Sequence, residues 1–186
     1  MPTLIQIDRL PLWTTKATSG DVIHIRRVDE SDGSHIRQYF RTLSGASRYR
    51  RFMGSVNELS PDETARFVGN GPVPTFAMAA EIRSNNERLI VGEASCALDL
   101  ERKSGDLGVS VGDPWQRRGI GSALVHVVEC CAIRLGLRHL LGEALQSNDE
   151  IKGLARRAGF AITRRPGEWQ VIRFEKRLPS SDRQPG

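Results

Sequence analysis

Two arginines and two glycines lie together in the segment DPWQRRGIGSAL, residues 113–124, between a short apolar run and a long amphipathic stretch. If a helix begins here, its first backbone N–H groups have no partner within the helix, and the helix dipole adds partial positive charge at that end. Gly119 and Gly121 would leave these amides open to a bulky group, while Arg117 and Arg118 add cations at the rim. The segment therefore predicts an anion site, with a diphosphate as its natural ligand.

The common phosphate-binding and metal-binding motifs are absent from the sequence. GxGxxG fails at Leu124, no acidic residue follows at the distance that a ribose contact requires, and GxxxxGK[ST] does not occur. The four histidines are scattered without HExxH, so no metal site is predicted. Cys96, Cys130 and Cys131 have neither a disulfide-framework nor a zinc spacing, and we expect buried thiols.

The periodicity of apolar residues predicts the elements that must position this segment. Apolar residues recur at helical spacing from Ile120 to Leu135, and Gly136 ends that helix. Further helices are expected after Asp29, from Ser60 and from Asn148, the last ending at Gly159. The expected strands are 23–28, 75–82, 89–98, 106–111, 139–145, 160–163 and 169–174, the last two forming a hairpin through Pro166 and Gly167.

The length of 186 residues indicates one domain, expected at residues 21–178, with a loosely ordered extension over 1–20 and a flexible tail over 179–186. No apolar run is long enough for a membrane span, and the first residues do not resemble a secretory signal, so we expect a cytoplasmic protein without a membrane partner. The net charge is +5, but the arginines are dispersed and aromatic residues make up only 6%. A nucleic-acid partner is therefore not expected.

Three segments together carry a family resemblance. VxDPWQRRGIGxAL, from Val111, resembles the acetyl-CoA signature of the GNAT N-acetyltransferase superfamily, whose core is Gln/Arg-x-x-Gly-x-Gly/Ala. Residues 141–160, LGEALxSNDEIKGLARRAGF, resemble the strand, asparagine-initiated helix and Gly-Phe that close this fold. Residues 43–52, LSGASRYRRF, resemble the LSxxSRYxRF segment of bacterial protein lysine acetyltransferases of the Pat type. The resemblance covers about residues 22–177.

The resemblance implies an α/β (α+β) GNAT fold, with a mixed, mostly antiparallel sheet of six to seven strands flanked by about four helices. Its fourth and fifth strands, here 106–111 and 139–145, would splay apart to admit the pantetheine of acetyl-CoA. Backbone groups of Val109 and Val111 would pair with the pantetheine amides, and Asn148 would approach the same arm or simply cap its helix. The diphosphate would be held by Gln116, Arg117, Arg118, Gly119, Gly121 and Ser122.

An amine can attack the thioester only when it is neutral, and a lysine with a pKa of roughly 10.4 is almost entirely charged at pH 7. A base must therefore remove a proton, usually through water. In Pat-like proteins a glutamate in a pattern resembling AEFAVVV has this role, and in the matching stretch GDLGVSV its place is taken by Asp106, which is one methylene shorter. Glu143 and Glu93 are the alternatives, although each also suits a salt bridge, and Asp106 also suits a turn beside Gly105.

A general acid for the departing thiolate is not evident. Many GNAT enzymes place a tyrosine seven residues after the helix-starting asparagine, where this chain has Ala155, as Pat-like proteins commonly do. The backbone N–H of Val109 or Val111 would stabilise the oxyanion. Arg48 and Arg51 would meet an acidic acceptor or the CoA 3′-phosphate, or end a solvated helix.

The sequence thus predicts an enzyme that moves acetyl, or propionyl, from CoA to a primary amine, with a protein lysine side chain as the first candidate acceptor. A small-molecule amine acetyltransferase and a non-catalytic CoA-binding module are the alternatives. Acetyl-CoA is the expected cosubstrate, no metal is expected, and the oligomeric state, monomer or homodimer, is left open.

Overall fold

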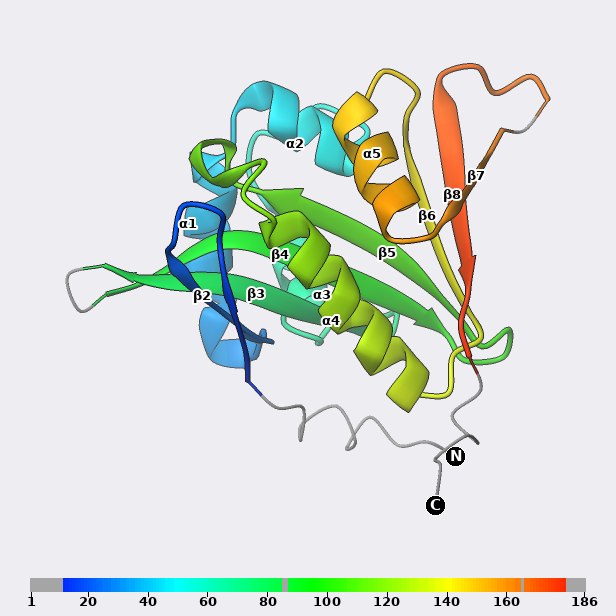
Figure 1. Ribbon diagram of the computed structural model, residues 1–186. Helices are drawn as coiled ribbons and strands as arrows, with labels where there is room; N and C mark the ends of the chain where they lie inside the picture. Colours follow the sequence, from blue (N-terminus) through cyan, green and yellow to red (C-terminus); the bar gives the residue numbers. More distant parts are fainter. Residues whose placement is uncertain (1–11, 85–86, 165, 180–186) are drawn as a thin grey trace.

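A computed structural model describes residues 12–84, 87–164 and 166–179, and Figure 1 shows one mixed β-sheet with helices packed against it. Within these residues the sheet has eight strands in the order β1-β2-β3-β4-β5-β6-β8-β7. The strands are β1 (Trp13–Lys16), β2 (Val22–Arg27), β3 (Thr75–Ser84), β4 (Glu87–Asp99), β5 (Ser104–Val111), β6 (His139–Leu145), β7 (Ala161–Thr163) and β8 (Val171–Arg177). The α-helices are α1 (Gly33–Thr42), α2 (Gly45–Phe52), α3 (Pro61–Phe67), α4 (Ile120–Arg134) and α5 (Asp149–Arg157), and short 3-10 helices lie at Glu30–Asp32 and Asp113–Trp115.

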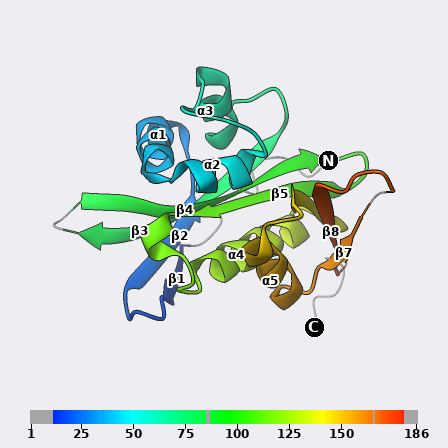
Figure 2. The ribbon, with the colours of Figure 1, turned by 90° about the horizontal axis from the view of Figure 1, so that it is seen from above.

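The helices form a layer on each face of the sheet. Helices α1, α2 and α3 cover one face, and α4 and α5 cover the other (Figure 2). The apolar stripe of α4 explains its place, because Ile120, Leu124, Val128 and Cys131 are almost completely buried against the sheet. A second, smaller apolar cluster, around Phe40, lies under the other layer. None of the described helices combines the length and apolar character needed to cross a membrane.

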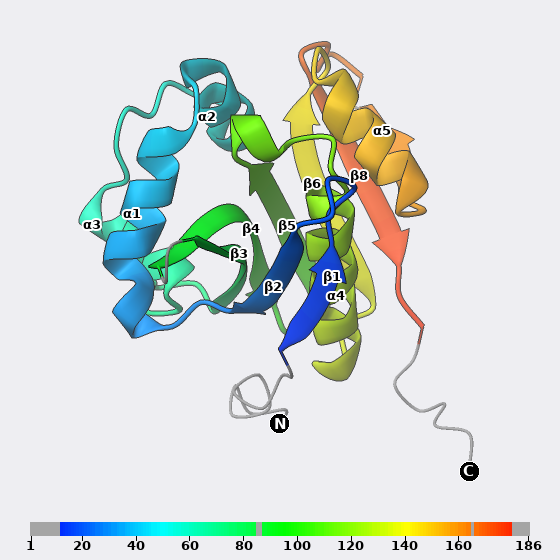
Figure 3. The same cartoon turned by 60° about the vertical axis from the view of Figure 1, so that its left-hand side comes forward.

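Strands β5 and β6 are the pair that positions the site. They run parallel and are paired only at their beginnings, where Ser104, Gly105 and Asp106 lie opposite His139, Leu140 and Leu141. Beyond these pairs β5 continues along β4, and β6 continues antiparallel to β8. The two strands therefore separate, with α2 on the β5 side and α5 and β8 on the β6 side (Figure 3).

The expected α/β class, with a mixed and mostly antiparallel sheet, is confirmed, but the expected numbers of strands and helices were too low for the part of the chain that the structure describes. The additional strand is β1, within the segment expected to be irregular; Trp13, Thr14 and Thr15 pair with β2 across a turn that contains Gly20 at φ +91°. The additional helix is α2, in the segment that resembles Pat-type proteins. Residues 1–11 and 180–186, on which the remaining expectations for the two ends fall, lie outside the described residues.

Candidate active site

The start of α4 has the backbone that the sequence predicted for an anion site. Gly119 is the N-cap residue, with φ +87° in the left-handed region, and no side chain caps the helix there. Arg117 is also left-handed, at φ +61°, so the chain turns sharply into the helix. A Cβ on Gly119 would meet nothing within 4 Å, which means that backbone conformation, and not space, requires glycine. The first-turn amides of α4 are thus left without a side-chain cap.

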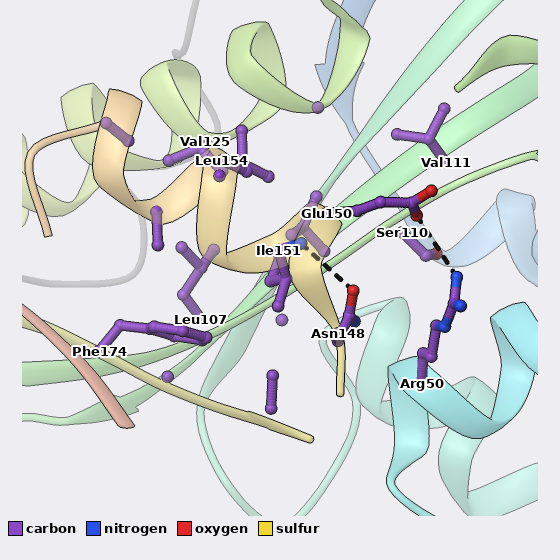
Figure 4. Close-up of a pocket in the computed structure, with 18 of the residues that line it drawn as sticks. Arg50, Leu107, Ser110, Val111, Val125, Asn148, Glu150, Ile151, Leu154 and Phe174 are labelled. Atoms are coloured by element: carbon purple, nitrogen blue, oxygen red, sulfur yellow. Dashed lines mark hydrogen bonds and ion pairs between the residues drawn. The ribbon is translucent and has the colours of Figure 1, made fainter. Parts of the chain in front are cut away.

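A cavity of about 590 Å³ begins at this helix start and extends between β5 and β6. Its wall includes two cations that the sequence analysis did not assign, Arg50 on α2 and Arg157 on α5. Figure 4 shows its apolar part, with Leu107, Val125, Leu154 and Phe174 around the gap. Eight of the nine residues expected to bind the cofactor line it, namely Val109, Val111, Gln116, Arg117, Gly119, Gly121, Ser122 and Asn148.

Arg118, the ninth, does not line this cavity. Its Nη1 lies 3.6 Å from Asp21 Oδ2, and its guanidinium carbon lies 4.9 Å from the centroid of the Trp115 ring. Its carbonyl accepts a hydrogen bond of 3.1 Å from the Thr18 N–H, just beyond β1. Arg118 thereby joins the β1–β2 hairpin to the turn before α4, and of the adjacent arginines only Arg117 lines the cavity.

The side chain of Gln116 holds the turn in place. Its Nε2 donates to the Val111 carbonyl at 3.1 Å and to Ser47 Oγ at 3.3 Å. Asp113, in the same turn, accepts from the Ser44 N–H at 2.9 Å, and from the hydroxyls of Ser44 and Ser47 at 2.8 Å each. Partial burial opposes ionisation of Asp113, but these hydrogen bonds outweigh it and lower its pKa below the usual carboxyl value. The turn and the start of α2 are therefore fixed to each other.

Strand β5 directs alternate backbone groups into the gap. The Gly112 N–H donates to the Val91 carbonyl of β4 at 2.9 Å. Because the groups of successive residues point to opposite edges of a strand, those of Val111, Val109 and Leu107 point away from β4, toward β6. The Leu107 carbonyl shows this directly, because a Cβ on Gly142 of β6 would lie 3.1 Å from its oxygen. With the Val111 carbonyl bonded to Gln116, the N–H groups of Val109 and Val111 and the Val109 carbonyl face the gap.

Asn148 begins α5 at the opposite wall of the cavity. It is buried, and its Oδ1 accepts a hydrogen bond of 3.2 Å from the Ile151 N–H (Figure 4). The expected helix cap is therefore present, and the same residue lines the cavity. Nearby, Arg50 Nη1 lies 3.4 Å from Glu150 Oε2, an ion pair that joins α2 to α5.

A second cavity, of about 670 Å³, contains both carboxylates that the sequence proposed for catalysis, Asp106 and Glu143. It shares Leu141, Gly142, Glu143 and Phe174 with the first cavity, so the two meet where β5 and β6 begin to separate. Its other apolar lining residues are Val73, Ala97 and Leu98.

The three candidate bases differ in what occupies their oxygens. Glu93 is almost fully buried and accepts from Arg51 Nε and from Ser110 Oγ, both at 2.7 Å. Glu143 forms an ion pair of 2.7 Å with Arg173 Nε. The side chain of Asp106 makes no hydrogen bond or ion pair with the described residues, and the residue is exposed to solvent in the groove. Partial desolvation by the groove walls and the charge of Glu143 raise its pKa, against a smaller opposing effect of Arg51. Asp106 is thus the carboxylate with free lone pairs.

Sequence reasoning missed the network around Glu93. A solvated position at the end of a helix was one of the expectations for Arg51, but its side chain is mostly buried. Its Nη2 also donates to Ser95 Oγ at 2.8 Å. Ser110 Oγ lies 2.9 Å from the hydroxyl of Tyr39, whose pKa is raised by burial and by the charge of Glu93. A glutamate within an apolar strand was the available signal, because such a charge requires a partner. No group of three or more His, Cys, Asp or Glu side chains suited to a metal ion occurs in the described part of the chain.

Comparison with known proteins agrees with this geometry. Residues 44–160, more than half of the chain, match the model of the acetyltransferase (GNAT) family. The chain belongs to this family. This GNAT acetyltransferase is 27% identical over 161 residues to acetyltransferase PA5475 of Pseudomonas aeruginosa, a match that covers 86% of this chain and 87% of that protein.

Two solved structures show the same fold. The GNAT domain of S. lividans PAT matches with a TM-score of 0.80 and 21% identity, covering 91% of this chain and 100% of that one. The Salmonella typhimurium protein yncA, solved with acetyl-CoA, matches with a TM-score of 0.65 and 19% identity, covering 84% of this chain and 94% of that one.

Proposed function

We propose that this GNAT protein transfers an acetyl group from acetyl-CoA to a primary amine, with a lysine side chain of a protein as the first candidate acceptor. The observation that carries the proposal is the meeting of two cavities where β5 and β6 separate. One cavity has open helix amides and cations that suit a diphosphate, and the other contains a carboxylate with free oxygens. A ligand from each side can therefore reach a common point.

The first cavity suits acetyl-CoA along its whole length. The amides at the start of α4, with Arg117 beside them, would hold the diphosphate, and Arg50 and Arg157 offer further cations for phosphate groups. The N–H groups of Val109 and Val111 and the Val109 carbonyl, which face the gap, would pair with the amides of the pantetheine arm, as an added strand would. An arm bound in this way would extend toward Gly142, which lines both cavities. Neighbouring GNAT structures with bound acetyl-CoA or CoA support this use of the fold.

The second cavity suits the aliphatic stem and charged end of a lysine. Leu98, Leu141 and Phe174 give apolar walls, while Asp106 and Glu143 attract a cation. In the proposed reaction Asp106 accepts a proton from the ammonium through water, and the neutral nitrogen attacks the thioester carbonyl carbon. A backbone N–H of β5 would stabilise the oxyanion. As the C–S bond breaks, the attacking nitrogen gives its second proton to water, which leaves a neutral amide, and the CoA thiolate takes a proton from solvent.

Protein lysine is favoured as the acceptor because two features of the sequence resemble Pat-type enzymes. These are the LSGASRYRRF segment, which contains α2, and the alanine at position 155. The S. lividans PAT domain, at 21% identity, shares the fold in which these residues lie.

The test is acetylation of a lysine-containing peptide by the protein with labelled acetyl-CoA, detected by mass spectrometry. We expect Asp106→Asn to reduce kcat/KM by about a hundredfold or more, because general-base assistance contributes about 10² to 10⁴. Asp62→Asn, which changes an exposed carboxylate on α3, is the matched control and should keep full activity. Binding of acetyl-CoA without any acetylated product, for the peptide or for small amines, would identify the chain as a CoA-binding module.

A further inference from the structure

A buried ion pair lies on the face of β5 that is covered by α2. Arg51, near the end of α2, donates from Nε to Glu93 Oε1 at 2.7 Å and from Nη2 to Ser95 Oγ at 2.8 Å. The side chains of Arg51 and Glu93 are 13% and 3% exposed. Burying a charged pair of this kind costs desolvation free energy. The proposed reaction gives neither Arg51 nor Glu93 a role that accounts for this cost.

The guanidinium lies directly on the backbone of Gly108. A Cβ at this position would be 2.6 Å from Arg51 Cζ and 2.7 Å from Nη2, and closer still to Nη1. Only glycine therefore leaves room for the arginine. Because side chains alternate along a strand, Asp106 and Ser110 project from the same face as the guanidinium, each about 7 Å along β5 from Gly108.

The orientation of the ion pair turns its positive end toward Asp106. Glu93 lies opposite Ser110 in the β4–β5 register, on the side of Gly108 that is farther from Asp106. The guanidinium, above Gly108, is thus nearer to Asp106 than its own partner carboxylate is. Arg51 accordingly favours the ionised form of Asp106.

Other charged groups that line the second cavity have hydrogen-bond or ion-pair partners of their own. On β8, Arg173 pairs with Glu143 of β6, and Glu175 lies 3.0 Å from His139. At the β4–β5 turn, Arg102 lies 3.5 Å from Asp99. Partial desolvation and the charge of Glu143 disfavour the ionised form of Asp106, and the charge of Arg51 favours it.

We infer that Arg51 is a positioning residue of the acceptor side: fixed above Gly108 by Glu93 and Ser95, it keeps Asp106 in the carboxylate form that a general base needs. This role rests on the proposed function, in which Asp106 accepts the proton of the amine. The geometry also assigns a purpose to Glu93, which holds the arginine in place without itself reaching the amine.

The test compares three proteins: wild type, Glu93→Gln, and the double variant Arg51→Met with Glu93→Gln. The double variant removes both charges and so leaves no buried charge unpaired, whereas Glu93→Gln keeps the arginine. Carboxyl ¹³C NMR of the ligand-free proteins follows the titration of Asp106, whose signal is assigned by its loss in Asp106→Asn. This measurement does not depend on any enzymatic activity.

We expect the Asp106 titration to move to higher pH in the double variant but not in Glu93→Gln. With acetyl-CoA and the lysine peptide, the acidic limb of kcat/KM should shift to higher pH in the double variant, in the same direction as the NMR titration. Equal titration of Asp106 in wild type and the double variant would overturn the inference. Absence of product from wild type, with the NMR shift present, would instead refute the proposed function.

Discussion

Two glycines at the start of α4 should respond oppositely to the same substitution. Gly119 has φ +87°, and a Cβ there would meet nothing within 4 Å. Gly121 is within the helix, and its Cβ would lie 3.5 Å from Leu154 Cδ2 and 3.7 Å from Val111 Cγ2, which are ordinary contacts. Gly119→Ala therefore tests backbone conformation alone, and Gly121→Ala is its matched control.

The magnitudes follow from these two environments. An alanine in the left-handed region costs about 1–2 kcal/mol, and in Gly119→Ala no new contact offsets this cost. Gly121→Ala should stabilise the fold by up to about 1 kcal/mol, because alanine is the better helix residue and loses less backbone freedom on folding. For a domain of this size 1 kcal/mol corresponds to about 2–4 °C in Tm. We expect Gly119→Ala to melt roughly 2–8 °C below wild type and Gly121→Ala at or above it.

Thermal unfolding with and without acetyl-CoA measures both the fold and the site. A ligand that binds only the native state raises Tm according to its concentration relative to Kd. The methyl group of Gly121→Ala lies in the cavity wall, so this variant should gain less from acetyl-CoA than wild type although its ligand-free stability is not lower. Equal stability of the two variants would show that the left-handed turn is not maintained in solution. If acetyl-CoA raised the Tm of Gly121→Ala as much as that of wild type, the diphosphate would not bind at the start of α4.

Three further predictions concern charged residues. Asp106→Asn should be more stable than wild type at neutral pH, because the raised carboxyl pKa means that folding favours the protonated acid. The difference in free energy of unfolding, measured with denaturant, should vanish as the pH falls below the ordinary carboxyl pKa. Asp113→Asn should lower the free energy of unfolding by about 1–2 kcal/mol, because it weakens the hydrogen bonds to residues such as Ser44. The pKa of Asp113 is lowered in the folded protein, so in pH-dependent melting wild type alone should lose this stability as acid protonates the carboxylate. Arg117→Ala should weaken acetyl-CoA binding, measured by calorimetry, by about threefold to tenfold, as expected for one charge-assisted contact. Arg118→Ala should change Kd by less than about twofold; equal losses of affinity in the two variants would show that Arg118 also binds the cofactor.

The features that the sequence predicted well are local in the chain. The apolar period of α4, the glycines at its start and the Asn148 cap lie within one or two turns of one another, so their residue types suffice to identify them. The gap between β5 and β6 was inferred from a family resemblance, because nothing within either strand reveals where their pairing ends.

The missed features depend on residues that are distant in the sequence. Arg51 and Glu93 are 42 positions apart, and neither identifies the other until the sheet forms. Helix α2 is short and rich in arginine, and its start is fixed by Asp113, 69 positions from Ser44. Similarly, Arg118 looked like a free cation because its partner Asp21 belongs to the β1–β2 hairpin.

Helix α2 provides a physical link between the two sides of the site. It is eight residues long, about 12 Å. Its start is bonded to the turn that precedes α4, through Asp113 and Gln116, and its end carries Arg51 to the face that contains Asp106. A shift of that turn on cofactor binding would therefore be transmitted to the guanidinium above Gly108.

Strand β5 divides the proposed chemistry between its two faces. Leu107, Val109 and Val111 turn their side chains toward the α4 layer and their backbone groups into the gap, where the cofactor would lie. Asp106 and Gly108 serve the acceptor face. Because this division follows from the two-residue period of a strand, slipping β5 by one residue would exchange the roles of its faces and place a valine under Arg51. Beyond Asp106, β5 is held in register on one side only, by β4, and Arg51 lies over that pairing, above Gly108 of β5 and bonded to Glu93 of β4.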